Sequence, residues 1–289
     1  MIFNLKNIYC KYKNSNNPVL HISDLKIDQG EIVFLIGASG VGKSTILETL
    51  GFMNNTVLSQ KNSVFDFKFE NSSENMLEFW SKNESKISDF RKKYLSFIFQ
   101  NTNLFPNLNA LDNVLITPLL QGDNLITTLN DSRKIFKKIF PKEYKEILND
   151  KKITEMSGGQ RQRLAFCRAI ATHYKILLAD EPTGNLDWAN ANNLMSHLIA
   201  DIRNKKSTAI VVSHDIHLAV SHADKIVYID KAKEENNNYF FGKISNENTF
   251  IKSEDNLWSS LELKNSSQKL NNELLVKYLQ DDIINKNKI

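Results

Sequence analysis

The sequence predicts an α/β fold with a mainly parallel sheet at its core. The prediction rests on three short apolar runs, at residues 31–36 (EIVFLI), 175–181 (KILLADE) and 208–213 (TAIVVS). Such runs are typical of strands that are covered on both faces, as the strands of a parallel sheet are. Helical spacing follows the first run from Lys43 onward, and helices commonly connect parallel strands.

Residues 1–30 predict an antiparallel β-ribbon ahead of this core. The stretches IFNLKNIYCKY (2–12) and VLHISDLKI (19–27) read as short strands, and the polar break KNSNNP separates them. A break rich in Asn and Pro predicts the turn between two such strands.

Length and composition predict one principal domain. The chain has 289 residues, which is room for one sizeable core and a small appendage. Its longest apolar run, IVFLIGA, is far short of the roughly 20 residues that span a bilayer, and its N-terminus lacks the order of a secretory signal. We therefore expect a cytosolic chain that does not cross a membrane by itself.

Charge and cysteine content argue against two further classes. The 37 basic and 33 acidic residues are scattered along the chain, which indicates a solvated surface, so no direct nucleic-acid partner is expected. Cys10 and Cys167 stand far apart, so we expect two buried thiols rather than a disulfide or a metal site.

The run GASGVGKST, at residues 37–45, directly follows the first predicted buried strand. By itself the pattern also fits a flexible turn, but a strand before it and a helix after it favour a phosphate-binding loop. The glycines leave room for inward-pointing N–H groups, Lys43 bridges the outer phosphates, and the hydroxyl of Ser44 can ligate Mg²⁺. The predicted nucleotide-binding residues of the loop are Gly37, Ala38, Ser39, Gly40, Val41, Gly42, Lys43, Ser44 and Thr45.

Two adjacent carboxylates end the second predicted core strand. Asp180 can hold the hydration shell of Mg²⁺, and Glu181 can accept a proton from an attacking water. Alone, such a pair also fits a plain exit from a strand into a loop. The phosphate-binding loop in the same chain favours the catalytic interpretation.

A second helix start with anion-binding character lies at MSGGQ, residues 156–160. Ser157, Gly158 and Gly159 precede a predicted helix from about Gln160 to Ile170. Standing alone, the glycines would indicate an ordinary loop. One nucleotide does not need two phosphate cradles from the same subunit, so the second cradle suggests a nucleotide held by a partner.

Together these motifs resemble those of the ATP-binding cassette (ABC) family over about residues 1–230. The elements stand in the family's order: the glycine loop, Gln100 after YLSFIF, MSGGQ, the acidic pair, GNLD at 184–187 and VVSHD with His214. Within the family, LADEPTGNLD is similar to ATPases that serve lipoprotein-release, macrolide-export and cell-division membrane subunits.

The resemblance implies a P-loop NTPase core, an N-terminal antiparallel β subdomain and a helical subdomain that carries the signature MSGGQ. It implies an ABC-type nucleotide-binding domain at residues 1–230, with the helical subdomain at about 101–165. Residues 231–289 are then a C-terminal extension. Within it, NNNYFFGKIS predicts an edge hairpin, and helical spacing at 269–284 predicts an amphipathic helix with the apolar stripe Leu270, Leu274, Leu275, Tyr278, Leu279, Ile283 and Ile284. That helix packs on its own domain or makes a dimer or regulatory contact.

The resemblance also assigns catalytic and metal-binding roles. Glu181, His214 and Gln100 are the implied catalytic residues: His214 hydrogen-bonds the γ-phosphate, and Gln100 senses the γ-phosphate, Mg²⁺ and water. The implied Mg²⁺ ligands are Ser44, Gln100 and Asp180. The implied cofactors are therefore ATP and Mg²⁺.

Further residues are implied to contact the nucleotide. Tyr12 would stack on adenine, with Tyr9 as the competing candidate. Asp187 would lie across a dimer seam and help to position water in the opposite site. The signature residues implied to contact the partner's nucleotide are Ser157, Gly158, Gly159 and Gln160.

The implied partners are a second copy in a head-to-tail dimer and a separate transmembrane permease. The groove near residues 105–120 would receive a cytosolic helix of that permease, which would hold the chain at the cytoplasmic face of the membrane. An exporter or extractor of lipoprotein or hydrophobic cargo is the favoured function. A mechanical transmitter without transport is the alternative, and a soluble ATPase acting on nucleic acid is disfavoured because the chain lacks sustained heptads, a second cassette and zinc-ligand cysteines.

Three features depart from the family pattern, and one of them is the C-terminal tail from about Ala232 to Ile289. Residues 52–90 are rich in Asn, Ser and Glu and lack the usual glycine-marked strand pair. The sequence therefore does not define the strands at the edge of that lobe. Met156 stands where leucine usually precedes SGGQ, a near-isosteric difference with little expected effect.

Overall fold

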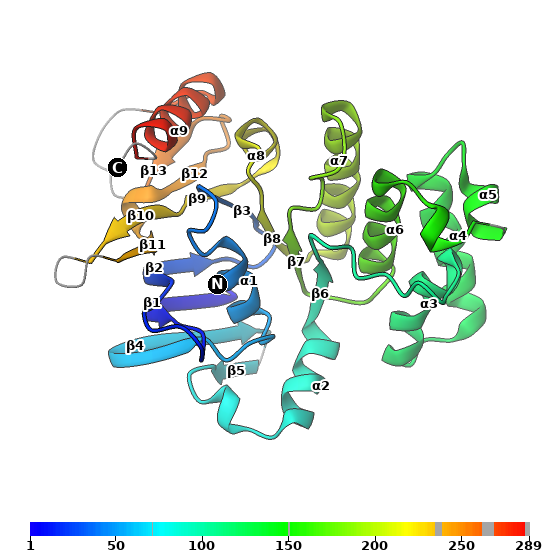
Figure 1. Ribbon diagram of the computed structural model, residues 1–289, viewed down its shortest axis with the longest axis horizontal. Coiled ribbons are helices and arrows are strands. Elements are labelled where there is room, and N and C mark those ends of the chain that lie inside the picture. The colour runs from blue at the N-terminus through cyan, green and yellow to red at the C-terminus, as the bar shows by residue number, and fades with distance from the viewer. Residues whose placement is uncertain (71, 150, 235–238, 262–268, 287–289) are drawn as a thin grey trace. The chain divides into compact units, whose positions relative to one another are not determined.

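The structure is a computed structural model that describes residues 1–289 except 71, 150, 235–238, 262–268 and 287–289, and, inside helices, omits the side chains of 149 and 282–286 (Figure 1). The chain forms two compact units, which we describe separately. Unit 1 comprises residues 1–88 and 208–289, and unit 2 comprises residues 89–207. The predicted domain limits, at residue 230 and at 101–165, stay predictions.

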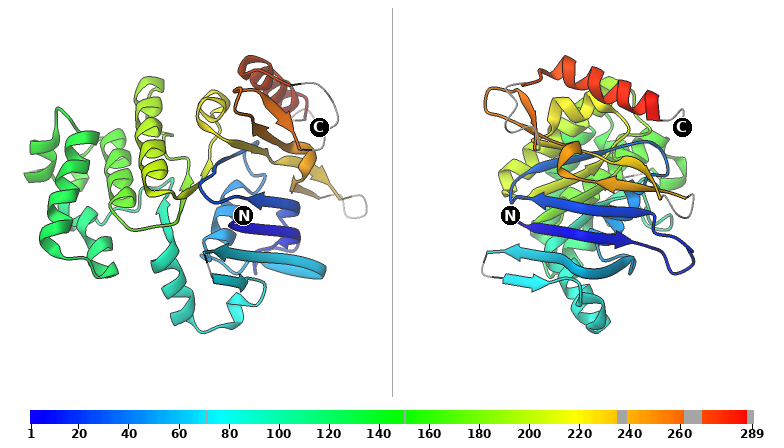
Figure 2. Two further views of the ribbon diagram at one scale, coloured as in Figure 1. Left: turned by 180° about the vertical axis from the view of Figure 1, so that it is seen from behind. Right: turned by 90° about the vertical axis from the view of Figure 1, so that its left-hand side faces the viewer.

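Unit 1 contains a six-stranded sheet in the order β10-β11-β2-β1-β4-β5, and Figure 2 shows its strands side by side. Its neighbours are antiparallel except for β11 and β2, which are parallel. The predicted antiparallel ribbon is therefore present. The strands are β1 (Phe3–Cys10), β2 (Leu20–Ile27), β4 (Val57–Phe69), β5 (Ser72–Asn75), β10 (Asp230–Lys233) and β11 (Phe240–Ile244).

The segment that lacks family glycines still forms a strand pair. β4 and β5 pair antiparallel, and Glu70, between them, takes the positive φ of 52° that a glycine would adopt more easily. Aromatic contacts pack β4 onto its neighbours, with ring centroids 5.5 Å apart for Phe3 of β1 and Phe67, and 5.8 Å apart for Phe52, which follows α1, and Phe65. A short 3₁₀ turn (Phe79–Ser81) and α2 (Glu84–Tyr94) follow.

The second sheet of unit 1 carries the predicted parallel core. Its strand order is β13-β12-β9-β3-β8, and β3 pairs in parallel with both β8 and β9. Every residue of β3 and β8 is buried, as expected of strands covered on both faces. The elements are β3 (Ile32–Ile36), β8 (Thr208–Val212), β9 (Lys225–Tyr228), β12 (Thr249–Lys252), β13 (Trp258–Ser260), α1 (Lys43–Leu50) and α8 (Ile216–His222).

The C-terminal segment extends this sheet. β12 joins β9 antiparallel, and α9 (Asn272–Lys286) packs beside α8 (Figure 1). Leu275 and Leu279 of the predicted apolar stripe are fully buried, whereas Leu274 and Tyr278 are about half exposed. The predicted stripe thus packs in part on its own unit, while the side chains of Ile283 and Ile284 lie outside the described residues.

Unit 2 is mainly helical around a parallel strand pair, β6 (Leu95–Ile98) and β7 (Ile176–Asp180). α3 packs against α4 and α6, and Met156, the first residue of the signature MSGGQ, is buried. The other elements are α3 (Ala110–Gln121), α4 (Leu125–Ile139), α5 (Tyr144–Asn149), a 3₁₀ turn (Ile153–Glu155), α6 (Gly158–Ile170) and α7 (Trp188–Lys205). Across both units, no helix in the described part of the chain combines the length and the apolarity that crossing a membrane requires.

Both cysteines are free thiols, and both are buried, as predicted. Burial raises the pKa of the Cys10 thiol to about 11, so this thiol stays protonated near neutral pH. Burial also raises the pKa of Cys167. Neither thiol therefore has the exposed, ionised character of a reactive cysteine.

Candidate functional site

The glycine-rich loop lies in unit 1 between the end of β3 and the start of α1. Ile36 is the last residue of β3, and Gly42 is the N-cap residue of α1. Gly42 has φ 93° and ψ 19°, a left-handed conformation that a side chain would strain. The loop therefore presents backbone N–H groups at a helix start, which is an arrangement that favours an anion.

Lys43 lies across this loop. Its Nζ donates hydrogen bonds of 2.9 and 2.8 Å to the carbonyl oxygens of Gly37 and Ala38. Ser44 is exposed in the first turn of α1, whereas Thr45 is buried. A positive charge over the loop and an exposed hydroxyl beside it suit a phosphate and its metal ion.

Gly242, far from the loop in sequence, limits the space behind it. It lies on β11, and its N–H donates a 2.9 Å hydrogen bond to the carbonyl oxygen of Val19. A Cβ on Gly242 would overlap the carbonyl group of Val41 and lie 2.9 Å from Cγ2 of Ile229. Sequence reasoning missed this residue, because only the packing of β11 against the loop reveals it.

We expect Gly242→Ala to distort the loop and to weaken nucleotide binding. Forcing a methyl group into close-packed space costs about 1–3 kcal/mol, and here the atoms that must yield belong to the loop backbone. Titration with a fluorescent nucleotide and thermal unfolding would measure both effects. Lys243→Ala, at the next residue of β11, is the matched control, and unchanged affinity and stability in Gly242→Ala would contradict this packing.

Tyr12 is anchored to α1 by its hydroxyl group. The hydroxyl donates a 2.7 Å hydrogen bond to Oε2 of Glu48 and lies 3.1 Å from Oγ1 of Thr45. Burial raises the pKa of Tyr12 to about 12, and the Glu48 carboxylate adds to this, so the phenol remains a donor. Glu48 gave no signal in the sequence. The rival Tyr9 instead stacks on His21, with centroids 4.0 Å apart, so these contacts favour Tyr12 for adenine.

His214 follows β8 at the edge of the sheet where β3 leads into the loop. β3 and β8 are parallel neighbours with Leu35 opposite Val212, so their carboxyl ends lie at the same edge. Asp215 caps α8 by accepting a hydrogen bond from the N–H of Leu218, and this cap fixes the turn that carries the exposed His214. Ligands commonly bind beyond the carboxyl ends of parallel strands.

In unit 2, Gln100 and the acidic pair share a second strand edge. β6 and β7 are parallel neighbours with Ile98 opposite Ala179. Gln100 follows β6, Asp180 ends β7, and Glu181 follows at once with a φ of 46°. A left-handed conformation at a residue with a side chain is uncommon and often accompanies a functional site.

Gln162 connects the signature helix to the acidic pair, and sequence reasoning did not single it out. Its side chain is buried, and its Nε2 donates a 3.0 Å hydrogen bond to the carbonyl oxygen of Glu181. Its Oε1 accepts a 2.9 Å hydrogen bond from Asn185 of the GNLD segment. The sequence carried no signal for this residue, because its burial and its two hydrogen bonds come from tertiary packing.

Ser157 and Gln160 form a reciprocal cap at the start of α6. Oγ of Ser157 accepts from the N–H of Gln160 at 3.2 Å, and Oε1 of Gln160 accepts from the N–H of Ser157 at 3.0 Å. The remaining amide group of Gln160 donates to Glu143 at 2.8 Å. This capping box presents Gly158 and Gly159 on the first turn, while Gln160 itself is held inside the unit.

A cleft of about 320 Å³ in unit 2 brings several predicted residues together. Gln100, Gly158 and Asn185 line it, with Arg161 beside them. Arg168 of α6 holds the segment after Gln100 by donating to the carbonyl oxygens of Thr102 and Asn103, at 2.7 and 2.6 Å.

Asp187 caps α7. Its Oδ1 accepts a 3.0 Å hydrogen bond from the N–H of Asn190, and its Oδ2 accepts one of 2.6 Å from that residue's side chain. The backbone N–H of Asn190, followed by its amide, holds the pKa of Asp187 below its ordinary value. The side chain is exposed at the helix start. Its predicted role at a dimer seam stays a prediction.

The predicted site residues therefore form two sets, one in each unit. Comparison with known proteins assigns the chain to one family. The family model described as ABC transporter matches residues 20–184, which is more than half of the chain. The chain belongs to the ABC transporter family. This cassette is 32% identical over 232 residues to the lipoprotein-releasing system ATP-binding protein of Porphyromonas gingivalis, covering 79% of this chain and 96% of that protein.

A second relative and two solved structures support the same family assignment. The cassette is 32% identical over 238 residues to the bacitracin export ATP-binding protein of Halalkalibacterium halodurans, covering 79% of this chain and 85% of that protein. It matches the dimeric structure of MJ0796, a bacterial ABC transporter cassette, with a TM-score of 0.66 and 29% identity over 78% of this chain and 94% of that one. A post-hydrolysis dimer of MJ0796 with bound ADP and Pi also matches, with a TM-score of 0.64.

The family fixes the general activity of this cassette. It is an ATP-binding and ATP-hydrolysing subunit of the ABC transporter type, and its fold is the predicted P-loop NTPase α/β fold. The predictions of fold class, family and enzymatic activity are therefore confirmed. The roles of individual residues stay predictions, which the contacts above support to different degrees.

Proposed function

We propose that two copies of this cassette share each ATP site. The glycine loop of one copy, with Tyr12 and His214, binds ATP, and the signature turn at Ser157 of the other copy contacts the γ-phosphate. Glu181 takes the proton of the attacking water. The capped start of α6, which presents two partly exposed glycines and is not needed for a second nucleotide in the same copy, is the observation that carries this proposal.

ATP then acts as a link between the copies, and hydrolysis removes that link. Only the γ-phosphate completes the second cradle, so ATP and ADP differ in their affinity for the closed dimer. That difference is what allows hydrolysis to drive a movement.

We propose that Ser44, Gln100 and Asp180 hold Mg²⁺. A hydroxyl, an amide and a carboxylate supply the oxygen ligands that Mg²⁺ prefers, and the exposed Ser44 hydroxyl on α1 suits this role. Bound Mg²⁺ would neutralise charge on the phosphate oxygens. Each of the three residues would supply it with an oxygen ligand.

We propose that a separate membrane protein docks on the helical part of unit 2. A cleft of about 440 Å³ is lined by Phe97, Phe99 and Phe105, and Phe105 is 48% exposed. Leu120 on α3 is 68% exposed. The three phenylalanines that line the cleft fit the apolar face of a short amphipathic helix of a partner.

The cargo that we propose is a lipoprotein or another hydrophobic molecule, exported or extracted at the membrane. Support comes from the relatives named for lipoprotein release and bacitracin export. The cassette would then act at the cytoplasmic face of the membrane, held there by its partner.

We expect Phe105→Glu to reduce copurification of the multi-span partner about tenfold or more. Burying a carboxylate in an apolar groove is costly, and central aromatic residues dominate such interfaces. The tagged chain would be purified from detergent-extracted membranes, and the partner quantified by mass spectrometry.

Leu274→Glu is the matched control, because Leu274 is 51% exposed and lies on α9. Equal partner loss in both variants would contradict docking at the groove, and thermal unfolding would identify a misfolded variant. With the recovered partner in lipid vesicles, ATP-dependent release of a lipoprotein supports transport. ATP-dependent partner movement without any release would replace transport with the mechanical alternative.

A further inference from the structure

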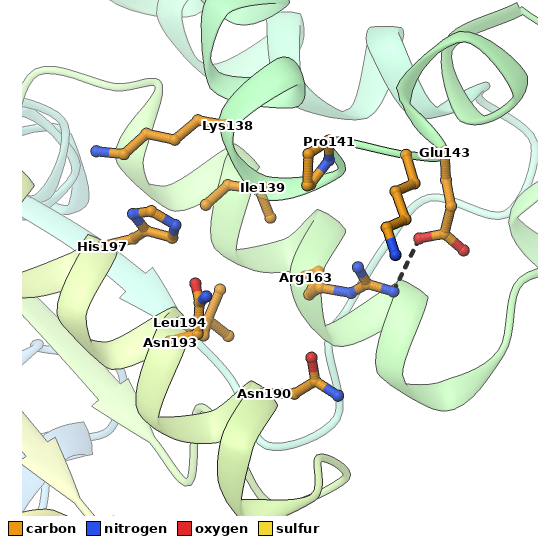
Figure 3. A pocket seen from close by; sticks show the side chains of 10 residues that line it. Lys138, Ile139, Pro141, Glu143, Arg163, Asn190, Asn193, Leu194 and His197 are labelled. Carbon is orange, nitrogen blue, oxygen red and sulfur yellow. Dashed lines mark hydrogen bonds and ion pairs between the residues drawn. The ribbon is translucent and has the colours of Figure 1, made fainter.

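Unit 2 contains a further cleft, of about 490 Å³, which the proposed ATP site does not use (Figure 3). The end of α4, the connection to α5, α6 and α7 all contribute to its lining. Buried Ile139 and Leu194 form part of its wall. A volume of this size lies in the range of small-molecule sites, about 300–1,000 Å³.

The lining of this cleft is cationic. Lys138, Lys142 and Arg163 bring three positive charges to it, and Glu143 is the carboxylate in its lining. Within the described part of the chain, neither lysine has an acidic group at ion-pair distance. Asn193 of α7 adds an amide group on the opposite wall, and so does Asn190, whose amide also donates to Asp187.

The lowered pKa of His197 agrees with an excess of positive charge in the cleft. The pKa of His197 is lowered, first by burial and then by the charge of Lys138. The other charged groups that line the cleft are Lys142, Glu143 and Arg163, and Glu143 is already engaged by Arg163 at 3.1 Å. A bound anion would offset this charge excess.

We propose that this cleft binds a small phosphate-class anion, such as inorganic pyrophosphate, between α4, α6 and α7. Lysine and arginine side chains form charge-assisted hydrogen bonds with phosphate oxygens, and the guanidinium of Arg163 can offer two parallel donors. The amides of α7 would complete the coordination from the other side.

The anion site is coupled to the signature turn through Glu143. One carboxylate oxygen of Glu143 accepts from Arg163, and the other accepts from Gln160 at 2.8 Å. An anion that draws Arg163 away loosens the hold of Glu143 on the capping box of α6. A change in ATP turnover caused through Glu143 rests on the proposed shared ATP site. Binding of the anion to the cleft does not rest on it.

The test uses the full chain with Lys43→Ala, which disables phosphate binding at the glycine loop, and follows histidine side chains by NMR. The imidazole of each histidine is titrated with pH, with about 10 mM pyrophosphate or with sodium chloride at equal ionic strength. We expect pyrophosphate to raise the pKa of His197 by about 1, because a nearby negative charge stabilises the imidazolium. His197→Gln assigns the resonance.

Lysine-to-glutamate substitutions test where the anion binds. Lys138→Glu and Lys142→Glu should each weaken pyrophosphate binding about tenfold, the loss expected when one charge-assisted contact is removed. Lys134→Glu, one turn earlier on α4 with a 77% exposed side chain, should leave binding unchanged. An unchanged pKa of His197, an equal shift of all histidines, or an equal loss in Lys134→Glu would overturn the proposal. Failure of the shared ATP site would leave this binding result intact.

Discussion

Glu181→Gln is expected to lower ATP turnover by about 10²–10⁴-fold while preserving ATP binding. A positioned general base contributes about that much, and glutamine is isosteric but cannot accept the proton. The backbone carbonyl of residue 181, which accepts from Gln162, is unaffected by the change. Phosphate release would report turnover, and nucleotide titration would report binding.

The same substitution should lock a dimer in saturating ATP and Mg²⁺. If ATP links two copies and only hydrolysis releases them, a variant that binds without cleaving accumulates in the linked state. Sedimentation with ATP and with ADP would distinguish this state from constitutive association. Glu273→Gln, on α9, is the control that should turn over ATP and separate normally. A Glu181→Gln chain that stays monomeric in ATP would count against the shared site.

Two inactive variants are expected to restore each other when mixed. Lys43→Ala disables the glycine loop, and Ser157→Arg places a bulky cation in the signature turn. If each site takes its loop from one copy and its signature from the other, a mixed dimer has one intact site and one doubly damaged site. At equal amounts, turnover should recover to roughly a quarter of the wild-type rate, since half of the dimers are mixed and each retains one of two sites.

Sites built within one copy predict no recovery on mixing. Replacing Ser157 also removes a helix cap that contributes about 0.5–2 kcal/mol, so thermal unfolding of each variant must precede the assay. Ser157→Arg retains its own glycine loop and should still bind nucleotide, whereas Lys43→Ala should not. Full turnover by Ser157→Arg alone would refute the role of the signature turn.

Local sequence was enough for motifs whose function depends on neighbouring residues. The strand, glycine loop and helix at 32–50 were predicted as a unit, and α1 begins at Lys43 as expected. The carboxylates at the end of β7 and the helix start at the signature were predicted for the same reason. In each case the conformation follows from a short run of residues and its hydrogen bonds.

Residues that act through contacts with distant parts of the chain are not marked by any motif in the sequence. Gly242 restricts the loop from a strand two hundred positions away, and Glu48 positions Tyr12 through one hydrogen bond. The β4–β5 pair formed without the glycines by which the family marks it, because Glu70 adopts the left-handed conformation of the turn and aromatic contacts pack β4 onto its neighbours.

By itself, the sequence determined the ABC family, the α/β class and the order of the nucleotide motifs, because these reside in contiguous segments with characteristic spacing. Only the tertiary structure decided that Gln162 joins the signature helix to Glu181 and that Lys138, Arg163 and His197 line one cleft. Such contacts depend on which faces of separate elements pack together. Which faces pack together depends on how the shapes of many side chains fit at the same time. The sequence of one segment alone does not contain that information.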